Sequence, residues 1–236
     1  MDNLLEFLGR EKPDILFCQE VHNATAPDML PNYYSLKAFE CLNFPYSIFT
    51  PAGVYIDENG KAEQGNAIFS RFPLTKQPTV YMNGKYQEIE DNVENRPHLP
   101  RIIQHAAADT PLGKLNLLNV HGVYDLDGDS YSTARQQMGE IILQTAELLS
   151  NVIIAGDTNA PVSNQMIKEI AKVYPSVFAD NPPKSSFNMR RKTDPGYGVV
   201  AVDNIFASPN LRSFDTSVPD IDISDHLPVI THFVIE

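Results

Sequence analysis

The sequence contains many short apolar segments and only three amphipathic helix patterns, and this imbalance most constrains the fold. Each apolar segment ends at turn or polar residues, as expected of buried strands. The predicted strands cover residues 14–19, 46–50, 54–56, 66–70, 101–108, 114–120, 152–155, 203–207 and 227–235. Helices are predicted near the N-terminus and over about 133–150 and 163–173. Because strands and helices do not alternate in a βαβ rhythm, the pattern predicts sheets packed face to face.

Two of the predicted strands are joined by Glu58-Asn59-Gly60, which reads as a hairpin turn, because Asn-Gly supplies the positive φ angles.

No feature of the sequence divides the chain into domains. Its 236 residues are 42% hydrophobic and 20% charged, with no repeat, linker or low-complexity segment. We therefore expect one domain over residues 1–236.

The sequence also indicates where the protein works. No apolar run approaches the roughly 20 residues needed to cross a bilayer, and the acidic, amphipathic N-terminus does not resemble a signal peptide. Two cysteines, Cys18 and Cys41, cannot form a disulfide framework, which favours a reducing compartment. We expect a cytoplasmic monomer without a transmembrane segment.

Side chains that can bind metal ions or move protons lie where the apolar strands begin or stop. These residues are Glu20, His121, Asp157, Asn159, Asp203, Asp225 and His226. Each one alone is more often a turn or surface residue. Because strand ends converge on one rim of a sheet, together they can face a single cleft, which is the arrangement that hard cations and phosphoryl transfer require.

Six motifs carry these residues in a fixed order: QE, GNAIFSR, NVHG, GDTN, VDNIF and SDHLPV. In this order they resemble the endonuclease/exonuclease/phosphatase superfamily, which has the deoxyribonuclease-I fold. The resemblance spans residues 14–233. It implies an α/β four-layer sandwich, in which two mixed, mostly antiparallel sheets are flanked by helices and the active site lies at one edge. It also implies hydrolysis of a phosphoester by metal-assisted attack of water, without a covalent intermediate.

The resemblance gives three residues roles at the metal ion and the water. Glu20 matches the principal ligand of Mg²⁺, or of Mn²⁺ in its place, and a carboxylate suits a hard ion. Asp157 matches the carboxylate that positions and deprotonates the attacking water. Asn159 matches the amide that helps to hold the phosphate and that water.

The other four residues are assigned to the phosphate and its surroundings. His226 matches the imidazole that contacts the scissile phosphate, and Asp203 matches the carboxylate that orients this imidazole and raises its pKa. His121 matches a position that contacts the phosphate or protonates the leaving group. Asp225 matches a carboxylate near the metal that could serve a second ion. Within GNAIFSR, Asn66 and Arg71 match positions whose role is mainly structural.

The charge of the chain bears on the substrate. Lys and Arg total 18 against 30 acidic residues, for a net charge of -12. This balance favours a small-molecule or lipid-like phosphoester or a general phosphodiesterase over a nuclease, although a nucleic-acid substrate stays among the alternatives. A local basic cluster could still bind a phosphate-rich ligand, although a solvated loop is the more common explanation of such a cluster. Its members are Lys184, Arg190, Arg191 and Lys192.

Three other functions fit the sequence less well than phosphoester hydrolysis. Asp125, Asp127 and Asp129 are spaced as in a calcium loop, but Ser130 stands where that loop needs Gly and Gln136 where it needs Glu. No G-x-S-x-G motif supports a serine hydrolase. A catalytically impaired scaffold that acts as a binding protein is the remaining alternative. Such a scaffold would tolerate Asp157→Ala and show no metal-dependent hydrolysis.

One element of the family pattern is not in the sequence. Family members normally begin with a strand that ends in an Asn of the metal site, about a dozen residues before the first helix. This sequence begins at that helix. An unfilled slot in a sheet exposes backbone groups and apolar side chains. We therefore expect reduced stability or activity for residues 1–236 alone. Adding upstream coding sequence should raise the melting temperature or the turnover, and no gain in either would refute this expectation.

Overall fold

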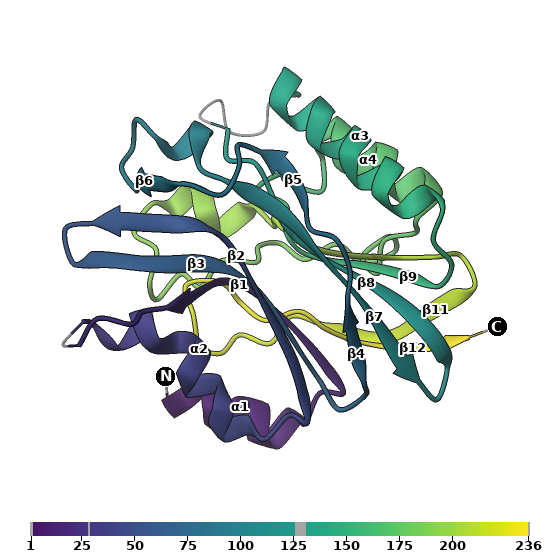
Figure 1. Ribbon diagram of the computed structural model, residues 1–236. Coiled ribbons are helices and arrows are strands. Elements are labelled where there is room, and N and C mark those ends of the chain that lie inside the picture. Colours follow the sequence, from purple (N-terminus) through teal and green to yellow (C-terminus); the bar gives the residue numbers. More distant parts are fainter. Residues whose placement is uncertain (1, 28, 126–130, 236) are drawn as a thin grey trace.

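The computed structural model describes residues 2–27, 29–125 and 131–235, and its core is two β-sheets packed face to face (Figure 1). One sheet has the order β1 (Ile15–Asn23), β3 (Gly60–Ser70), β2 (Tyr46–Asp57) and β6 (Glu88–Glu90). The other has the order β10 (Asp203–Ala207), β9 (Val152–Asp157), β8 (Gly113–His121), β7 (Arg101–Thr110) and β4 (Leu74–Lys76), and β5 (Val80–Asn83) also pairs with β7. Among these strands only β2 with β6 and β8 with β9 are parallel. The sheets are therefore mixed and mostly antiparallel.

Helices cover the outer faces of both sheets, which completes four layers. Helices α3 (Thr133–Glu147) and α4 (Gln165–Val173) pack on the six-stranded sheet, where Met138 and Ile142 of α3 are fully buried. Burying each of these side chains contributes roughly 1.5–3 kcal/mol. On the four-stranded sheet lie α1 (Asp2–Glu11), α2 (Ser35–Ala38) and the 3₁₀ turn Phe39–Leu42. The four-layer sandwich expected from the sequence is confirmed.

Helix ends follow local capping groups. The Ser132 side chain accepts a hydrogen bond from the Arg135 backbone N–H and starts α3, and the Asn164 side chain caps α4 in the same way. The helix predicted over 133–150 ends at Glu147, because the next residue, Leu148, is 92% exposed and leaves the helical conformation. The predicted hairpin is confirmed, but only Gly60 of the Asn-Gly pair has a positive φ, of 139°, so the expectation of a positive φ at Asn59 is wrong.

Strands β11 (Leu211–Ser217) and β12 (Ile230–Ile235) pair only with each other and form a separate two-stranded sheet among the described residues. Side chains of β12 nevertheless join the cores on both faces of the four-stranded sheet. Phe233 packs into the cluster between the sheets, and Ile230 packs into the cluster beneath α1. Strand β12 therefore lies in the same layer as the four-stranded sheet. Three further 3₁₀ turns occur at Pro31–Tyr34, Arg96–His98 and Pro195–Val199. No helix in the described ranges is long and apolar enough to span a membrane.

A buried asparagine connects the two sheets. Asn119 of β8 is fully buried, and its Nδ2 lies 3.0 Å from the carbonyl oxygens of Cys18 on β1 and Ala67 on β3. Its Oδ1 accepts a hydrogen bond of 2.7 Å from the Gln19 amide. Asn66, on β3, donates to the Asn119 backbone carbonyl at 2.9 Å. These bonds fix how the sheets are placed against each other, since a buried polar group is stable only in the arrangement that satisfies it.

We predict that Asn119→Ala lowers the free energy of unfolding by about 3 kcal/mol, because it leaves buried carbonyl groups and the Gln19 amide without partners. Urea unfolding followed by circular dichroism measures the change. Asn210→Ala, at an exposed site, is the matched control and should stay within about 0.5 kcal/mol of the parent protein. Equal stabilities for the two variants would contradict the proposed connection between the sheets.

Candidate active site

Four charged or titratable side chains line one edge of the six-stranded sheet. His121 ends β8 directly opposite Asp157, which ends the parallel strand β9. Asp157 is in turn opposite Asp203, which begins the antiparallel strand β10. Arg101 begins β7, the antiparallel neighbour of β8 on the other side. Adjacent strands lie about 4.8 Å apart, so this edge forms a continuous row of functional groups.

Glu20 approaches this row from the other sheet. The register of β1 against β3 shifts between Cys18 and Val21, and Glu20 lies in this bulge with a φ of 54°. A β-bulge re-aims side chains, and a positive φ at a residue other than glycine is uncommon. The Glu20 carboxylate is 58% exposed and lies 3.8 Å from His121 Nε2. The irregularity thus brings an exposed carboxylate to the boundary between the two sheets.

Asp157 is the most enclosed carboxylate of the site, with 13% of its side chain exposed. The Asn159 backbone N–H donates to its Oδ1 at 2.7 Å. Burial raises the pKa of Asp157, and the negative charges of Asp203 and Glu20 raise it further against the opposing effect of His226. The preceding Gly156 has a φ of 141°, and a Cβ there would lie 2.0 Å from the Val120 carbonyl oxygen. Only glycine therefore fits before this aspartate.

His226 is held between two aspartates. Its Nδ1 lies 2.8 Å from Asp203 Oδ2, and its Nε2 lies 4.0 Å from Asp157 Oδ2. Burial lowers the pKa of His226, but the hydrogen bond and charge of Asp203, together with Asp157 and Asp225, outweigh it and raise the pKa to about 10. His226 is therefore an imidazolium at neutral pH.

His121 has the opposite charge state. It is 5% exposed, and its Nδ1 lies 3.3 Å from Arg101 Nη1. Burial lowers the pKa of His121 well below 6.5, and the positive charges of Arg101 and His226 lower it further. A neutral imidazole can donate a hydrogen bond to the phosphate, but it is poorly suited to protonate a leaving group. Of the two roles expected from the sequence, the lowered pKa of His121 therefore favours the phosphate contact.

Asn159 and Asp225 complete the set of predicted residues. Asn159 has a φ of 49°, and its Nδ2 donates to the Gly122 carbonyl at 3.0 Å, which fixes the amide beside Asp157. Asp225 precedes His226 and forms an ion pair of 2.6 Å with Lys192 Nζ. The structure thus gathers all seven predicted residues around the ends of β8, β9 and β10, although Asp225 faces a lysine.

The basic cluster of the sequence is largely neutralised by acids. Arg190 pairs with Asp220, Arg191 with Asp222, and Lys192 with Asp225. Only Lys184 of the four has no ion pair with a described residue. Asn66 lies in β3 and bonds to Asn119, so it supports the sheets. Of the suggested calcium loop, Asp127, Asp129 and Ser130 lie outside the described residues.

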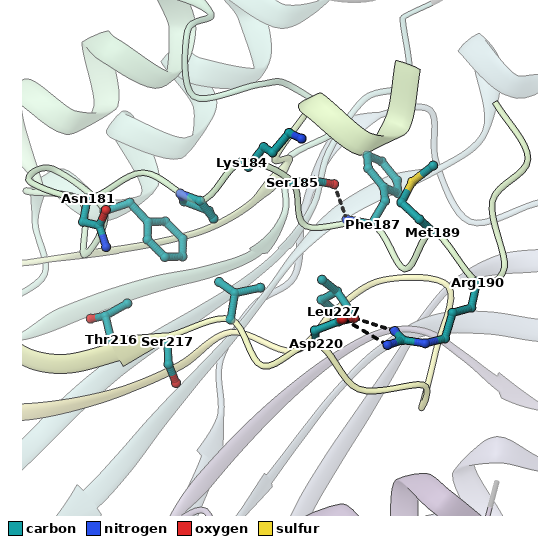
Figure 2. A pocket seen from close by; sticks show the side chains of 13 residues that line it. Asn181, Lys184, Ser185, Phe187, Met189, Arg190, Thr216, Ser217, Asp220 and Leu227 are labelled. Atoms are coloured by element: carbon teal, nitrogen blue, oxygen red, sulfur yellow. Dashed lines mark hydrogen bonds and ion pairs between the residues drawn. The ribbon is translucent and has the colours of Figure 1, made fainter. Parts of the chain in front are cut away.

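A pocket of about 770 Å³ is lined by Phe187 and by Leu227, the residue that follows His226 (Figure 2). The Phe187 ring centroid lies 4.5 Å from that of His226 and 4.6 Å from that of Tyr197. Lys184 and the ion pair of Arg190 with Asp220 also line this pocket. The pocket therefore combines an aromatic ring that contacts His226 with charged side chains in the same lining.

A metal ion fits the donor groups of this edge. No three His, Cys, Asp or Glu side chains form a ready-made cluster in the described part of the chain. Mg²⁺, however, is usually bound by one or two carboxylates, with water and substrate phosphate filling the remaining positions. Glu20 offers an exposed carboxylate, and its charge reaches Asp157, whose pKa it raises. The excess of negative charge between these residues suits a hard cation.

Two groups at the site were missed by the sequence analysis. Arg101 stands at the beginning of its strand, whereas most of the candidate residues in the sequence follow a strand. Because β7 runs antiparallel to β8, its first residue lies at the same edge as the last residue of β8. The sequence did contain a signal for Arg101, because it is a charged residue directly before the apolar residues of the strand. Lys192 was seen only as part of a basic loop, since its contact with Asp225 joins residues 33 apart in the chain.

Comparisons with known proteins agree with this geometry. The model of the Endonuclease/Exonuclease/phosphatase family matches residues 1–226. A comparison with curated protein sequences finds no match. The fold is similar to an endonuclease/exonuclease/phosphatase from Beutenbergia cavernae (TM-score 0.71, 18% identity), with 98% of this chain covering 65% of that one. It is also similar to the Bacteroides thetaiotaomicron mannosyl-6-phosphatase Bt3783 (TM-score 0.69, 18% identity, 98% and 89% covered) and to the human Nocturnin catalytic domain (TM-score 0.66, 16% identity, 100% and 85% covered).

We predict that Asp203→Asn lowers the pKa of His226, because it removes the carboxylate that stabilises the imidazolium. A group whose pKa is raised on folding stabilises the protein fully below its unfolded pKa, near 6.5, and loses this contribution as the pH rises towards its folded pKa of about 10. Unfolding free energy should therefore fall over this window, and fall less steeply in Asp203→Asn. NMR titration of the His226 ring and urea unfolding at several pH values, both without divalent metal, measure the two effects.

The matched control is Asp109→Asn, whose carboxylate lies 3.8 Å from Lys114 on the surface. This variant should leave the His226 titration unchanged. If Asp203→Asn also leaves it unchanged, Asp203 does not set the charge of the imidazole.

Proposed function

Because the chain belongs to the endonuclease/exonuclease/phosphatase family, whose members are hydrolases acting on phosphoesters, we propose that it is a divalent-metal-dependent phosphoester hydrolase. The observation that carries the proposal is the position of Asp157. This enclosed carboxylate lies between the imidazolium of His226 and the neutral imidazole of His121, along one edge of a sheet. Such a row offers a base, a positive charge and a neutral donor to one phosphate.

Asp157 is the group that takes a proton from water. Its raised pKa makes it a stronger base than an exposed aspartate, which suits proton transfer near neutral pH. The Asn159 N–H occupies Oδ1, so Oδ2 is the oxygen available to water. The Asn159 side chain, anchored on the Gly122 carbonyl, keeps its own oxygen free for the water or the phosphate. Water itself is the nucleophile, so no covalent intermediate with the chain arises.

The two histidines act on the phosphate in different ways. His226 carries a positive charge and stabilises the negative charge that develops on the phosphate oxygens in the transition state. Asp203 holds Nδ1 at 2.8 Å and thereby leaves Nε2 to face the substrate. His121 stays neutral and contributes a hydrogen bond without changing the net charge of the site.

Glu20 is the residue we expect to hold Mg²⁺ or Mn²⁺. When bound, such an ion supplies positive charge to the phosphate oxygens and to the leaving group. The exposed position of the Glu20 carboxylate leaves room for water and substrate as further ligands of the ion. Asp225 is paired with Lys192, so it is less available as a ligand.

Charges beside the site favour a compact substrate over a nucleic acid. On the side of Glu20, a hollow of about 570 Å³ is lined by four acidic residues, which are Asp57, Glu58, Glu90 and Asp91. Burial lowers the pKa of His22, which lies two residues after Glu20, and the charges of Asp57 and Asp91 oppose this effect, so the acidic hollow is close to the site. On the side of His226, the arginines are already paired with aspartates. A long polyanion would therefore meet repulsion on one side and few free cations on the other. We propose a small-molecule or lipid-like phosphoester.

We predict that hydrolysis requires Mg²⁺ or Mn²⁺ and falls by at least about a hundredfold in kcat in Asp157→Asn, because this change removes the base. The assay is a screen over DNA, RNA, inositol phosphates, sugar phosphates and lipid phosphodiesters, with and without EDTA. Turnover should be highest on one of the compact substrates.

Asp109→Asn, an exposed aspartate in β7, is the control and should retain full activity. Metal-dependent turnover that survives Asp157→Asn would remove Asp157 from the mechanism. Absence of turnover on every substrate would favour the alternative of a family-like scaffold that binds a partner.

A further inference from the structure

Arg101 is a buried cation that forms no ion pair with any residue the structure describes. Only 6% of the residue is exposed, and no carboxylate lies within ion-pair distance of it among the residues that the structure describes. Its Nε is buried without a hydrogen-bond partner. The one side-chain hydrogen bond it makes to a described residue is the 3.3 Å contact between Nη1 and His121 Nδ1. A guanidinium stays protonated at any ordinary pH, so this charge cannot be removed by titration.

Such an arrangement is costly to the folded protein. Burying a charge without an opposite charge is among the least favourable events in folding. Several other arginines do have acidic partners, namely Arg10, Arg71, Arg190 and Arg191. Arg101 lies beside the proposed active site, where an anionic group of the substrate can supply the missing charge. Unpaired charges that persist at an active site usually serve binding or catalysis.

The contact with His121 has a fixed direction. Arginine has no acceptor, so Nη1 donates and Nδ1 of His121 accepts. In a neutral imidazole that accepts at Nδ1, the proton is on Nε2. Nε2 lies on the side of Glu20, at 3.8 Å from its Oε1. Arg101 therefore makes His121 a donor towards the space between the two sheets.

We propose that Arg101 is a positioning residue for the phosphate of the substrate. It holds His121 as the Nε2–H tautomer, so that this imidazole donates to a non-bridging phosphate oxygen, and its own charge attracts the anion. Arg101 stands two strands from Asp157, roughly 10 Å at the usual spacing, so it acts on the phosphate and leaves the attacking water to Asp157. The substrate class that follows is an anionic phosphoester, and this inference rests on the proposed function for its ligand.

The first test is the tautomer of His121, read from long-range ¹H–¹⁵N NMR spectra of protein labelled at histidine and free of metal. The parent protein should show the Nε2–H form. Arg101→Lys keeps a donor and should keep this form, whereas Arg101→Met should lose it. Finding the Nδ1–H form in the parent protein overturns the proposal, and this result needs no variant to fold.

The second test is the binding of inorganic phosphate, measured by isothermal titration calorimetry on the metal-free chain. Arg101→Met should bind phosphate at least about tenfold more weakly than the parent protein, since a charge-assisted contact is lost, and Arg101→Lys should recover part of the affinity. Arg10→Met, at an arginine whose side chain is 66% exposed, should bind like the parent. Equal affinities of Arg101→Met and Arg10→Met would overturn the proposal.

These tests separate the two levels of inference. Neither the tautomer nor phosphate binding requires turnover. A chain that gives both expected results but hydrolyses nothing would refute the hydrolase and keep the role of Arg101. If the parent protein hydrolyses phosphoesters and the tautomer of His121 is unchanged in Arg101→Met, the hydrolase proposal is kept and the role of Arg101 is refuted.

Discussion

The buried side chain of Asn119 is the contact on which the site depends. It joins β8 of one sheet to β1 and β3 of the other through hydrogen bonds to Cys18 and Ala67. Two residues beyond Asn119 is His121, and two residues beyond Cys18 is Glu20. Fixing the first pair therefore brings the second pair together, at 3.8 Å between Nε2 and Oε1. Apolar packing alone is less selective for one arrangement than a buried amide, which is stable only where its hydrogen-bond partners meet it.

The two histidines show how neighbours decide the chemistry of identical side chains. The carboxylates of Asp203, Asp157 and Asp225 raise the pKa of His226 in spite of its burial, whereas burial together with the Arg101 guanidinium lowers the pKa of His121. Both rings are held at Nδ1, one as donor to Asp203 and the other as acceptor from Arg101, which leaves Nε2 of each directed into the site. Under the proposed function, His226 beside its carboxylates would stabilise negative charge, and His121 beside Arg101 would donate a hydrogen bond.

Much of this arrangement could be predicted from the sequence, because it depends on residues at the ends of apolar strands. The core strands and three helices follow from local patterns, and Glu20, His121, Asp157 and Asp203 are marked by their place beside these strands. Strands such as β4 and β6 have three residues each, too few to show a period. Asn119 looked like one polar residue in an apolar strand. Its partners are about 50 and 100 residues away, so its role belongs to tertiary structure.

Net charge is a poor guide to how this chain meets an anion. A net charge of -12 suggests that the protein repels phosphate. Salt screening, however, weakens the effect of charges that lie more than roughly 8 Å from the phosphate at physiological salt. Within that range the phosphate would meet His226 as a cation, and Arg101 as a second cation behind His121. The exposed arginines Arg190 and Arg191 are bound to aspartates and offer little. We therefore expect affinity for phosphate to come from the half-buried His226 and the buried Arg101 at one edge of the six-stranded sheet, and we expect the acidic surface around them to disfavour a long polyanion.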